Sequence, residues 1–166
     1  MISQGKSILY IAIAALLALL GGITWYASLD NPQLAMAEIE LADVTVQSVN
    51  NIEGRANLEV DFLVKNPGEK TFTVSLIDYE LFADGTSLGK GQYSTEDIPL
   101  PGRAAFYPGA EIALPTTFQL IHSDANSDAY QAIVGEQPVK FSAKGKIVVE
   151  SAWSLVEKEF EISQQR

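Results

Sequence analysis

The chain has 166 residues, of which 47% are hydrophobic, enough for one hydrophobic core plus an extension, and nothing in it requires a second domain. Its 21 acidic and 11 basic residues give a formal net charge of -10. This charge repels phosphate groups, so nucleic acid is not an expected partner. With no cysteine and one histidine, disulfides, thiolate metal sites and sites built on several histidines are excluded.

The N-terminal region, residues 1–29, predicts a single transmembrane anchor. No charged residue occurs in residues 7–29, and the run from Ile8 to Leu20 is almost entirely Ile, Leu and Ala. About 20 apolar residues in a helix cross the roughly 30 Å hydrocarbon layer, so residues 7–29 are expected to contact the lipid bilayer. Trp25 and Tyr26 suit the headgroup boundary.

The position of Lys6 before the apolar run sets the expected orientation. Basic residues favour the cytoplasmic side, so we expect a single-pass protein of the cell membrane with a cytoplasmic N-terminus and an extracytoplasmic C-terminal domain. A cleaved signal peptide is the alternative, because Ala35-Met36-Ala37 has the A-x-A pattern of a cleavage site. That pattern lies far beyond Leu20, whereas cleavage sites closely follow a 7–15-residue apolar region, which favours an uncleaved signal-anchor. A buried core helix is disfavoured, since the strand-rich remainder is too small to enclose it.

Residues 30–37 are predicted to be a linker. Asp30-Asn31-Pro32 is expected to end the helix, because proline lacks an amide hydrogen and restricts the backbone, and the residues after it are expected to form a short tether. The folded domain is predicted over residues 38–163.

The first two predicted strands show period-2 alternation. In the first, Ile39 and Leu41 point inward and Val44 and Val46 then take the inward phase, which requires a β-bulge at residues 42–43. The second is the clearest half-buried strand of the chain. Its inward residues are Ala56, Leu58, Val60, Phe62 and Val64.

Turns and a second phase change follow. Asn66-Pro67-Gly68 ends the second strand, and the next strand changes its inward phase near Leu76, which predicts a bulge or a switch between sheets. Asp84-Gly85 is a strong hairpin signal, and residues 88–93 return as a strand interrupted by glycines. Residues 98–102 are expected to form an irregular edge segment because of their prolines.

The C-terminal third contains the one predicted helix. Pro115 indicates an edge or kinked strand around residues 112–120. Residues 123–134 predict a short helix capped by Ser123 or Asp124. Strands are then expected over residues 139–149 and 153–162. The first carries outward lysines that either pair with acidic residues or are solvated, and the second carries an outward acidic row of Glu157, Glu159 and Glu161.

Short strands at regular intervals, bounded by Gly, Pro, Asn and Asp, predict an all-β fold. We expect an antiparallel β-sandwich of immunoglobulin-like or fibronectin III-like architecture with one short helix, preceded by a single transmembrane helix. A small closed barrel is the alternative.

Few polar residues of the sequence are candidates for catalysis or metal binding. His122 lacks a G-x-S-x-G nucleophile motif or any other partner for a catalytic triad. Asp124, Asn126 and Asp128 match the first places of a calcium loop, but Ala129 and Gly135 stand where that loop needs glycine and glutamate. We therefore expect no enzyme activity and identify no catalytic residue, cofactor, metal site or small-molecule substrate.

One loop carries a candidate surface for protein contact. Phe106 and Tyr107 lie in the predicted loop of residues 102–109, and aromatic side chains in loops are effective anchors for a partner. The other interpretation is that both rings fold back onto the end of the sandwich and cap its core.

The turns and strands together resemble a known family. Phe62-Leu63-Val64-Lys65-Asn66-Pro67 is followed by Asp78-Tyr79 within an apolar strand, then by Asp84-Gly85 and Gly89-Lys90-Gly91. This ordered set is similar to the Water stress and Hypersensitive response (WHy) domain of group 2 late embryogenesis abundant (LEA type 2) proteins, over most of residues 38–162. The resemblance implies a β-sandwich associated with desiccation and stress tolerance, without a family active site. Members of this family include single-pass anchored forms.

The expected function is that of a non-enzymatic, membrane-anchored stress-protection protein with an acidic β-sandwich ectodomain. The alternative is a structural or adhesion module of the cell envelope that binds another protein through an edge strand or through the loop of residues 102–109.

Overall fold

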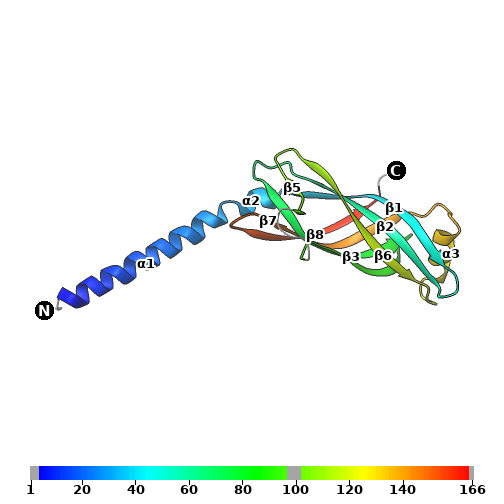
Figure 1. Cartoon of the computed structure of the whole chain (residues 1–166), viewed down its shortest axis with the longest axis horizontal. Helices are drawn as coiled ribbons and strands as arrows, with labels where there is room; N and C mark the ends of the chain where they lie inside the picture. The colour runs from blue at the N-terminus through cyan, green and yellow to red at the C-terminus, as the bar shows by residue number, and fades with distance from the viewer. Residues whose placement is uncertain (1–3, 97–101, 165–166) are drawn as a thin grey trace.

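A β-sandwich with a long helix projecting from one end is the architecture of the computed structural model, which describes residues 4–96 and 102–164 (Figure 1). The irregular segment expected over residues 98–102 therefore falls almost wholly outside the described residues. The helices are α1 (Gln4–Ser28), α2 (Asn31–Leu34) and α3 (Ser127–Val134). The strands are β1 (Glu38–Asn50), β2 (Arg55–Lys65), β3 (Phe72–Ala83), β4 (Thr86–Ser94), β5 (Ala105–Phe106), β6 (Glu111–Ile121), β7 (Phe141–Glu150) and β8 (Leu155–Ser163).

The strands form two separate antiparallel sheets. The first has the order β1-β2-β6, and the second has the order β4-β3-β7-β8 with the short β5 paired to β3. The antiparallel sandwich is therefore confirmed, and the described strands do not close into a barrel. Strand β6, which contains Pro115, lies at an edge of the first sheet, as the sequence predicted.

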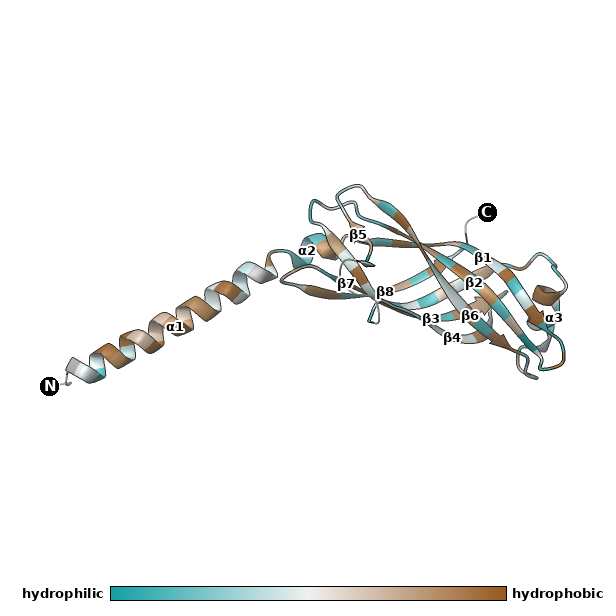
Figure 2. Ribbon diagram, in the orientation of Figure 1, coloured by the Kyte–Doolittle hydropathy of each residue, from teal (hydrophilic) through white to brown (hydrophobic). Residues whose placement is uncertain are grey.

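Strand β2 confirms the predicted alternation along its whole length. Its five inward residues, from Ala56 to Val64, are at most 1% exposed. Figure 2 shows the resulting change between hydrophobic and hydrophilic residues along the strands, in contrast to the largely hydrophobic α1. Both predicted phase changes are present as register shifts, between Leu41 and Asp43 in β1 and between Val74 and Leu76 in β3.

The second half of β1 differs in part from the prediction. Val44 is half-buried and packs against the core, as expected, whereas Val46 is 39% exposed although it was expected to face the core. A further register shift between Val46 and Ser48 re-aims this edge strand. Beneath it lies a hollow of about 290 Å³, lined in part by Val44, Val46, Ile133 and Phe141, so core side chains do not fill the space that the valines face.

Residues 30–37 pack against the sandwich instead of forming a free tether. Pro32 lies in the first turn of α2, where its missing amide hydrogen costs no helical hydrogen bond. Leu34 and Ala37 are at most 1% exposed and belong to the hydrophobic core. This short segment therefore contributes to folding of the domain.

The limits of two C-terminal elements differ from the prediction. Helix α3 begins at Ser127 with Asn126 as its N-cap, because the Asn126 side chain holds the preceding turn through hydrogen bonds with Ile121 and Ser123. The last strand begins at Leu155, and Trp153 lies in the turn before it, which is closed by a 2.8 Å hydrogen bond from Ser151 N to Ser154 O.

Aromatic rings fill the centre of the sandwich. Phe62 of the first sheet packs edge-on against Tyr79 of the second, with ring centroids 4.8 Å apart, and lies 6.1 Å from Phe160. Tyr79 also lies 6.2 Å from Phe118. Edge-to-face pairs of this kind add about 0.5–1.5 kcal/mol beyond their buried area.

The Tyr79 hydroxyl is the polar exception in this centre. It is buried without a hydrogen-bond partner of normal geometry among the described residues. Burial raises the pKa of Tyr79 from 10.0 to about 12, while the nearby Thr116 hydroxyl acts in the opposite direction. The fold therefore favours the neutral phenol.

Stability is expected to fall at alkaline pH because of Tyr79. The unfolded phenol loses its proton near pH 10, whereas the folded phenol keeps it until about pH 12. The free energy of unfolding should therefore decrease by about 2 kcal/mol as pH rises through this interval. Tyr79→Phe should remove that decrease and add about 1 kcal/mol at neutral pH by deleting an unpaired hydroxyl.

Urea unfolding of the full chain in detergent micelles at several pH values measures both effects. Tyr107→Phe, at an exposed position, is the matched control and should retain the alkaline decrease. An equal decrease in wild type and Tyr79→Phe would contradict the assignment to Tyr79.

Candidate functional site

His122 makes a local contact between β6 and α3. Its Nε2 lies 3.3 Å from the Ser127 hydroxyl, and its ring packs edge-on against Tyr130 at 4.9 Å. In the described part of the chain no carboxylate hydrogen-bonds to His122, so the histidine and serine lack the third group that orients a catalytic base.

The residues that resemble the start of a calcium loop are used by the backbone. Asn126 is 6% exposed, accepts from Ser123 N at 2.8 Å and donates to Ile121 O at 2.9 Å. Its side chain therefore holds the turn before α3. Across residues 4–96 and 102–164, no group of three or more acidic or histidine side chains is placed to hold a metal ion.

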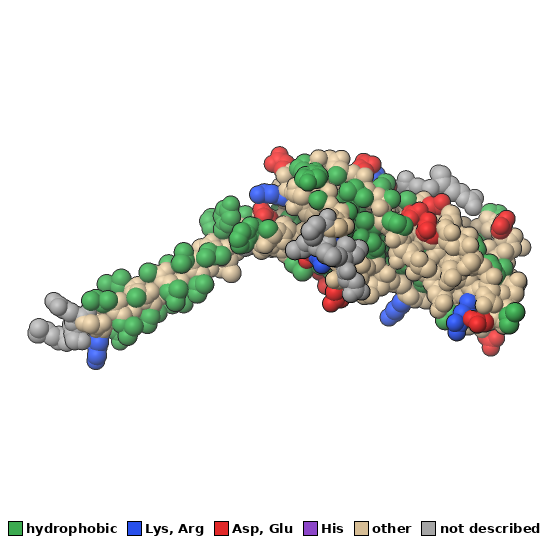
Figure 3. Space-filling model, viewed as in Figure 1, with side chains coloured by type: hydrophobic (Ala, Val, Ile, Leu, Met, Phe, Trp, Pro, Cys, Tyr) green, Lys and Arg blue, Asp and Glu red, His purple; other side chains and the backbone are tan. Residues whose placement is uncertain are grey.

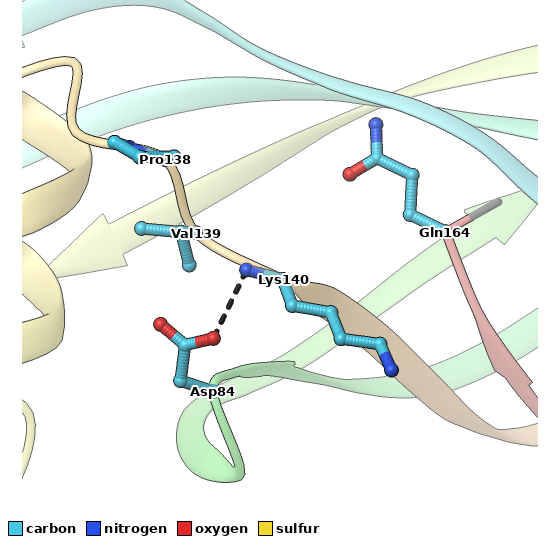
Figure 4. Close-up of a pocket in the computed structure, with 5 residues that line it drawn as sticks. All are labelled: Asp84, Pro138, Val139, Lys140 and Gln164. Atoms are coloured by element: carbon cyan, nitrogen blue, oxygen red, sulfur yellow. Dashed lines mark hydrogen bonds between the residues drawn. The ribbon is translucent and has the colours of Figure 1, made fainter. Parts of the chain in front are cut away.

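A hollow of about 460 Å³ lies between the β3–β4 turn and the segment before β7 (Figure 4). The Asp84 carboxylate accepts a 3.1 Å hydrogen bond from Lys140 N, while the Lys140 side chain points away from it. Gln164, on the other wall, donates to Asp43 at 3.0 Å. These polar groups brace the chain and form no pair of nucleophile and base.

The outer face of the second sheet carries paired charges. Lys146 lies 2.6 Å from Glu157, which raises the pKa of Lys146. Lys144 instead lies 3.8 Å from Glu80 and 4.5 Å from the centre of the Phe82 ring. The sequence left open whether these lysines pair with acidic residues or are solvated. Both are paired, Lys146 with Glu157 of the acidic row and Lys144 with Glu80 of β3. The acidic row of Glu157, Glu159 and Glu161 is exposed, as predicted.

The two aromatic residues of the loop over residues 102–109 have opposite environments. Phe106 is fully buried and stacks on Phe72, with ring centroids 5.2 Å apart, so its side chain is unavailable to a partner. The expectation that both rings offer a contact surface is therefore reduced to Tyr107, which is 65% exposed. Arg103 ties the start of the loop to Glu150 at 2.9 Å.

Asn66 holds this loop and the adjacent turn together. Its side chain is 1% exposed and donates to Phe106 O at 2.8 Å and Lys70 O at 2.9 Å, while accepting from Gly68 N at 3.0 Å. Its backbone exchanges hydrogen bonds with Gly109 and Ala110. The sequence marked Asn66-Pro67 as a turn, but only the long-range bonds identify Asn66 as a clamp.

The junction between α1 and the sandwich is also held by polar contacts that sequence reasoning missed. Lys70 pairs with Asp30 at 3.2 Å, and Lys158 donates to Ala37 O at 2.7 Å. The Ser154 hydroxyl donates to the side-chain oxygen of Asn31. No pattern in the sequence links residues more than one hundred positions apart.

Helix α1 has the length and apolar composition needed to cross a membrane, and no residue of its most apolar window is buried. Its surface is hydrophobic along most of its length, whereas acidic and basic side chains are distributed over the sandwich (Figure 3). This is the one such helix in the described chain.

One comparison with a solved structure supports the fold. No family model matches the sequence, and no curated protein matches it. A solution structure of a protein from Arabidopsis thaliana is similar at a TM-score of 0.50 and 13% identity, over 75% of this chain and 80% of that chain. A protein from Archaeoglobus fulgidus matches at a TM-score of 0.48 and 14% identity, over 76% and 94% of the two chains. A protein described as late embryogenesis abundant matches at 0.45 and 14%, over 97% and 90%.

Replacing Asn66 with alanine should destabilise the domain. Asn66→Ala leaves the carbonyls of Phe106 and Lys70 without their donor, at an expected cost of about 2–3 kcal/mol. The matched control is Asn57→Ala, which removes an exposed 3.1 Å bond to Ser48 and should change stability by at most about 0.5 kcal/mol. Urea unfolding in micelles measures both, and equal effects would contradict the clamp.

Proposed function

We propose that this protein is a non-enzymatic, membrane-anchored stress-protection protein of the WHy, LEA type 2 kind. The observation that carries the proposal is that the residues on which the family resemblance rests have structural roles in the sandwich. Asn66 clamps the loop, Tyr79 lies at the centre of the core, and Asp84 and Gly85 form the hairpin turn with φ of 47° and 84°. The resemblance therefore rests on residues that this fold needs.

Packing at the junction supports an uncleaved anchor. Cleavage after Ala37 would remove Leu34, a fully buried core residue, along with the hydrogen bond that Ala37 O accepts from Lys158. Lys6 favours a cytoplasmic N-terminus, which directs the sandwich to the extracytoplasmic side of the cell membrane.

The charge of the domain supports a physical mode of protection. A formal net charge of -10 and an exposed acidic row keep the surface hydrated and repel other anionic surfaces. An anchored body of this kind separates neighbouring membranes and proteins as water is lost. No step of this mechanism requires catalysis, a cofactor or a specific small molecule.

A drying assay tests the proposal. Vesicles that carry the full chain and an entrapped dye are dried and rehydrated, and leakage is compared with dye-filled vesicles dried with an equal mass of an unrelated acidic protein that has no membrane anchor. The full chain should reduce leakage more than the comparison protein, because its domain is held at the membrane. Glu159→Gln with Glu161→Gln, at exposed positions, should weaken the effect while leaving stability nearly unchanged. Equal leakage with both proteins would contradict protection.

A role in protein contact is the second candidate, and Tyr107 is the observation that favours it. Its ring is 65% exposed, while the adjacent Phe106 is locked in the core and the backbone is held by Asn66. A rigid, exposed aromatic side chain can anchor a partner in the cell envelope. The edge-strand route is less favoured, because Thr116 of β6 donates to Gln92 O at the edge strand β4.

Tyr107→Ala is the variant that tests this second candidate. An envelope protein that co-purifies with the full chain should be lost with Tyr107→Ala and retained with Ile52→Ala, which alters another highly exposed side chain. Phe106 is left unchanged because removing a buried ring would unfold the loop. Equal recovery with both variants would contradict binding through Tyr107.

A further inference from the structure

The turn between β7 and β8 faces the apolar helix. Trp153, at this turn, is 71% exposed, yet it lines a hollow of about 470 Å³ whose opposite wall is α1. The helix residues of that wall are Ala18, Leu19, Gly22, Ile23 and Tyr26. An indole ring so exposed, beside an apolar helix, leaves a hydrophobic surface that water alone would solvate poorly.

The hollow lies beside the part of α1 that is expected to be inside the hydrocarbon layer. Its helix wall extends from Tyr26 back to Ala18, about 12 Å along the helix axis at 1.5 Å per residue. With Trp25 and Tyr26 at the headgroup boundary, this wall lies in the outer half of a hydrocarbon layer of roughly 30 Å. In the proposed orientation of α1, Trp153 is therefore expected at the level of the outer leaflet.

The tip of the hairpin has the composition of a membrane-interface segment. Residues 151–155 read Ser-Ala-Trp-Ser-Leu and carry no charge, although the chain as a whole is strongly acidic. Leu155, next to the turn, is 61% exposed. Tryptophan combines a large apolar ring with one hydrogen-bond donor and is enriched where lipid meets water.

The hairpin is held in place relative to the end of α1. Ser154 hydrogen-bonds to Asn31 of α2, and Lys158 of β8 donates to Ala35 O and Ala37 O at 3.3 and 2.7 Å. Leu34 anchors the same segment in the core. The turn that carries Trp153 is thus held in place beside the end of α1.

We propose that the β7–β8 turn is a second membrane contact, in which Trp153 enters the outer leaflet and lipid acyl chains fill the hollow between it and α1. This inference rests on the proposed anchoring by α1 and extends it. It holds the sandwich base against the bilayer, with α3 at the opposite, membrane-distal end (Figure 1).

Tryptophan fluorescence in vesicles tests the contact, because the chain has two tryptophans, Trp25 and Trp153. The full chain is reconstituted into phosphatidylcholine vesicles with or without bromine atoms on the acyl chains, which quench nearby indoles. Trp25→Phe leaves Trp153 as the reporter, and its emission should be blue-shifted and largely lost in brominated vesicles. Trp153→Phe leaves Trp25, which reports insertion of α1 independently.

A third variant provides the water-exposed control. Ile52 is 99% exposed in the β1–β2 turn, at the end of the sandwich away from α1 (Figure 1), and Ile52→Trp in a chain without the native tryptophans should keep its emission. Quenching of Trp25 without quenching of Trp153 would overturn the second contact and leave the anchor intact. A blue-shifted but unquenched Trp153 would also overturn it, since the ring would then face protein. Absence of quenching at Trp25 would overturn the anchor itself.

Discussion

A row of alternating glycine and aromatic residues across the second sheet controls how the two sheets meet. Cross-strand pairing places Gly91, Tyr79, Gly145 and Phe160 side by side on β4, β3, β7 and β8. A Cβ atom at Gly91 would collide with the Tyr79 ring, and one at Gly145 would collide with the backbone of Asp78. Gly91 therefore leaves the space in which the Tyr79 ring packs, and Gly145 lets β7 approach the backbone of β3 closely. Phe62 of the opposite sheet fits against Tyr79 and Phe160.

The same packing leaves polar side chains to close the sandwich edges. At one edge Thr116 bonds to β4, and at the other Gln164 bonds to Asp43 of β1. The hollow between the β3–β4 turn and the segment before β7 is bordered by groups already engaged in hydrogen bonds, such as the Asp84 carboxylate with Lys140 N. The acidic row of β8 remains exposed, which is the feature that the proposed physical role at a membrane uses.

The junction connects this body to its helix. Leu34 is buried in the core. Asp30 forms an ion pair with the sandwich, and Asn31 and Ala37 accept hydrogen bonds from it. These contacts hold the segment after α1 beside the β7–β8 turn. In the proposed anchored form, the position of the sandwich relative to the membrane depends on the fold as well as on the apolar helix. The proposed protection by spacing and the proposed second lipid contact both depend on this braced geometry.

Local pattern determined much of this protein: the apolar N-terminal helix, the alternation of β2, both bulges and the Asp84-Gly85 turn follow from spacing and turn chemistry. Only the tertiary structure decided that Phe106 is core and Tyr107 surface, that Asn66 clamps a distant loop, and that Trp153 faces α1. These outcomes depend on contacts between residues far apart in the chain, and period-2 patterns specify a face of a strand without specifying what covers it.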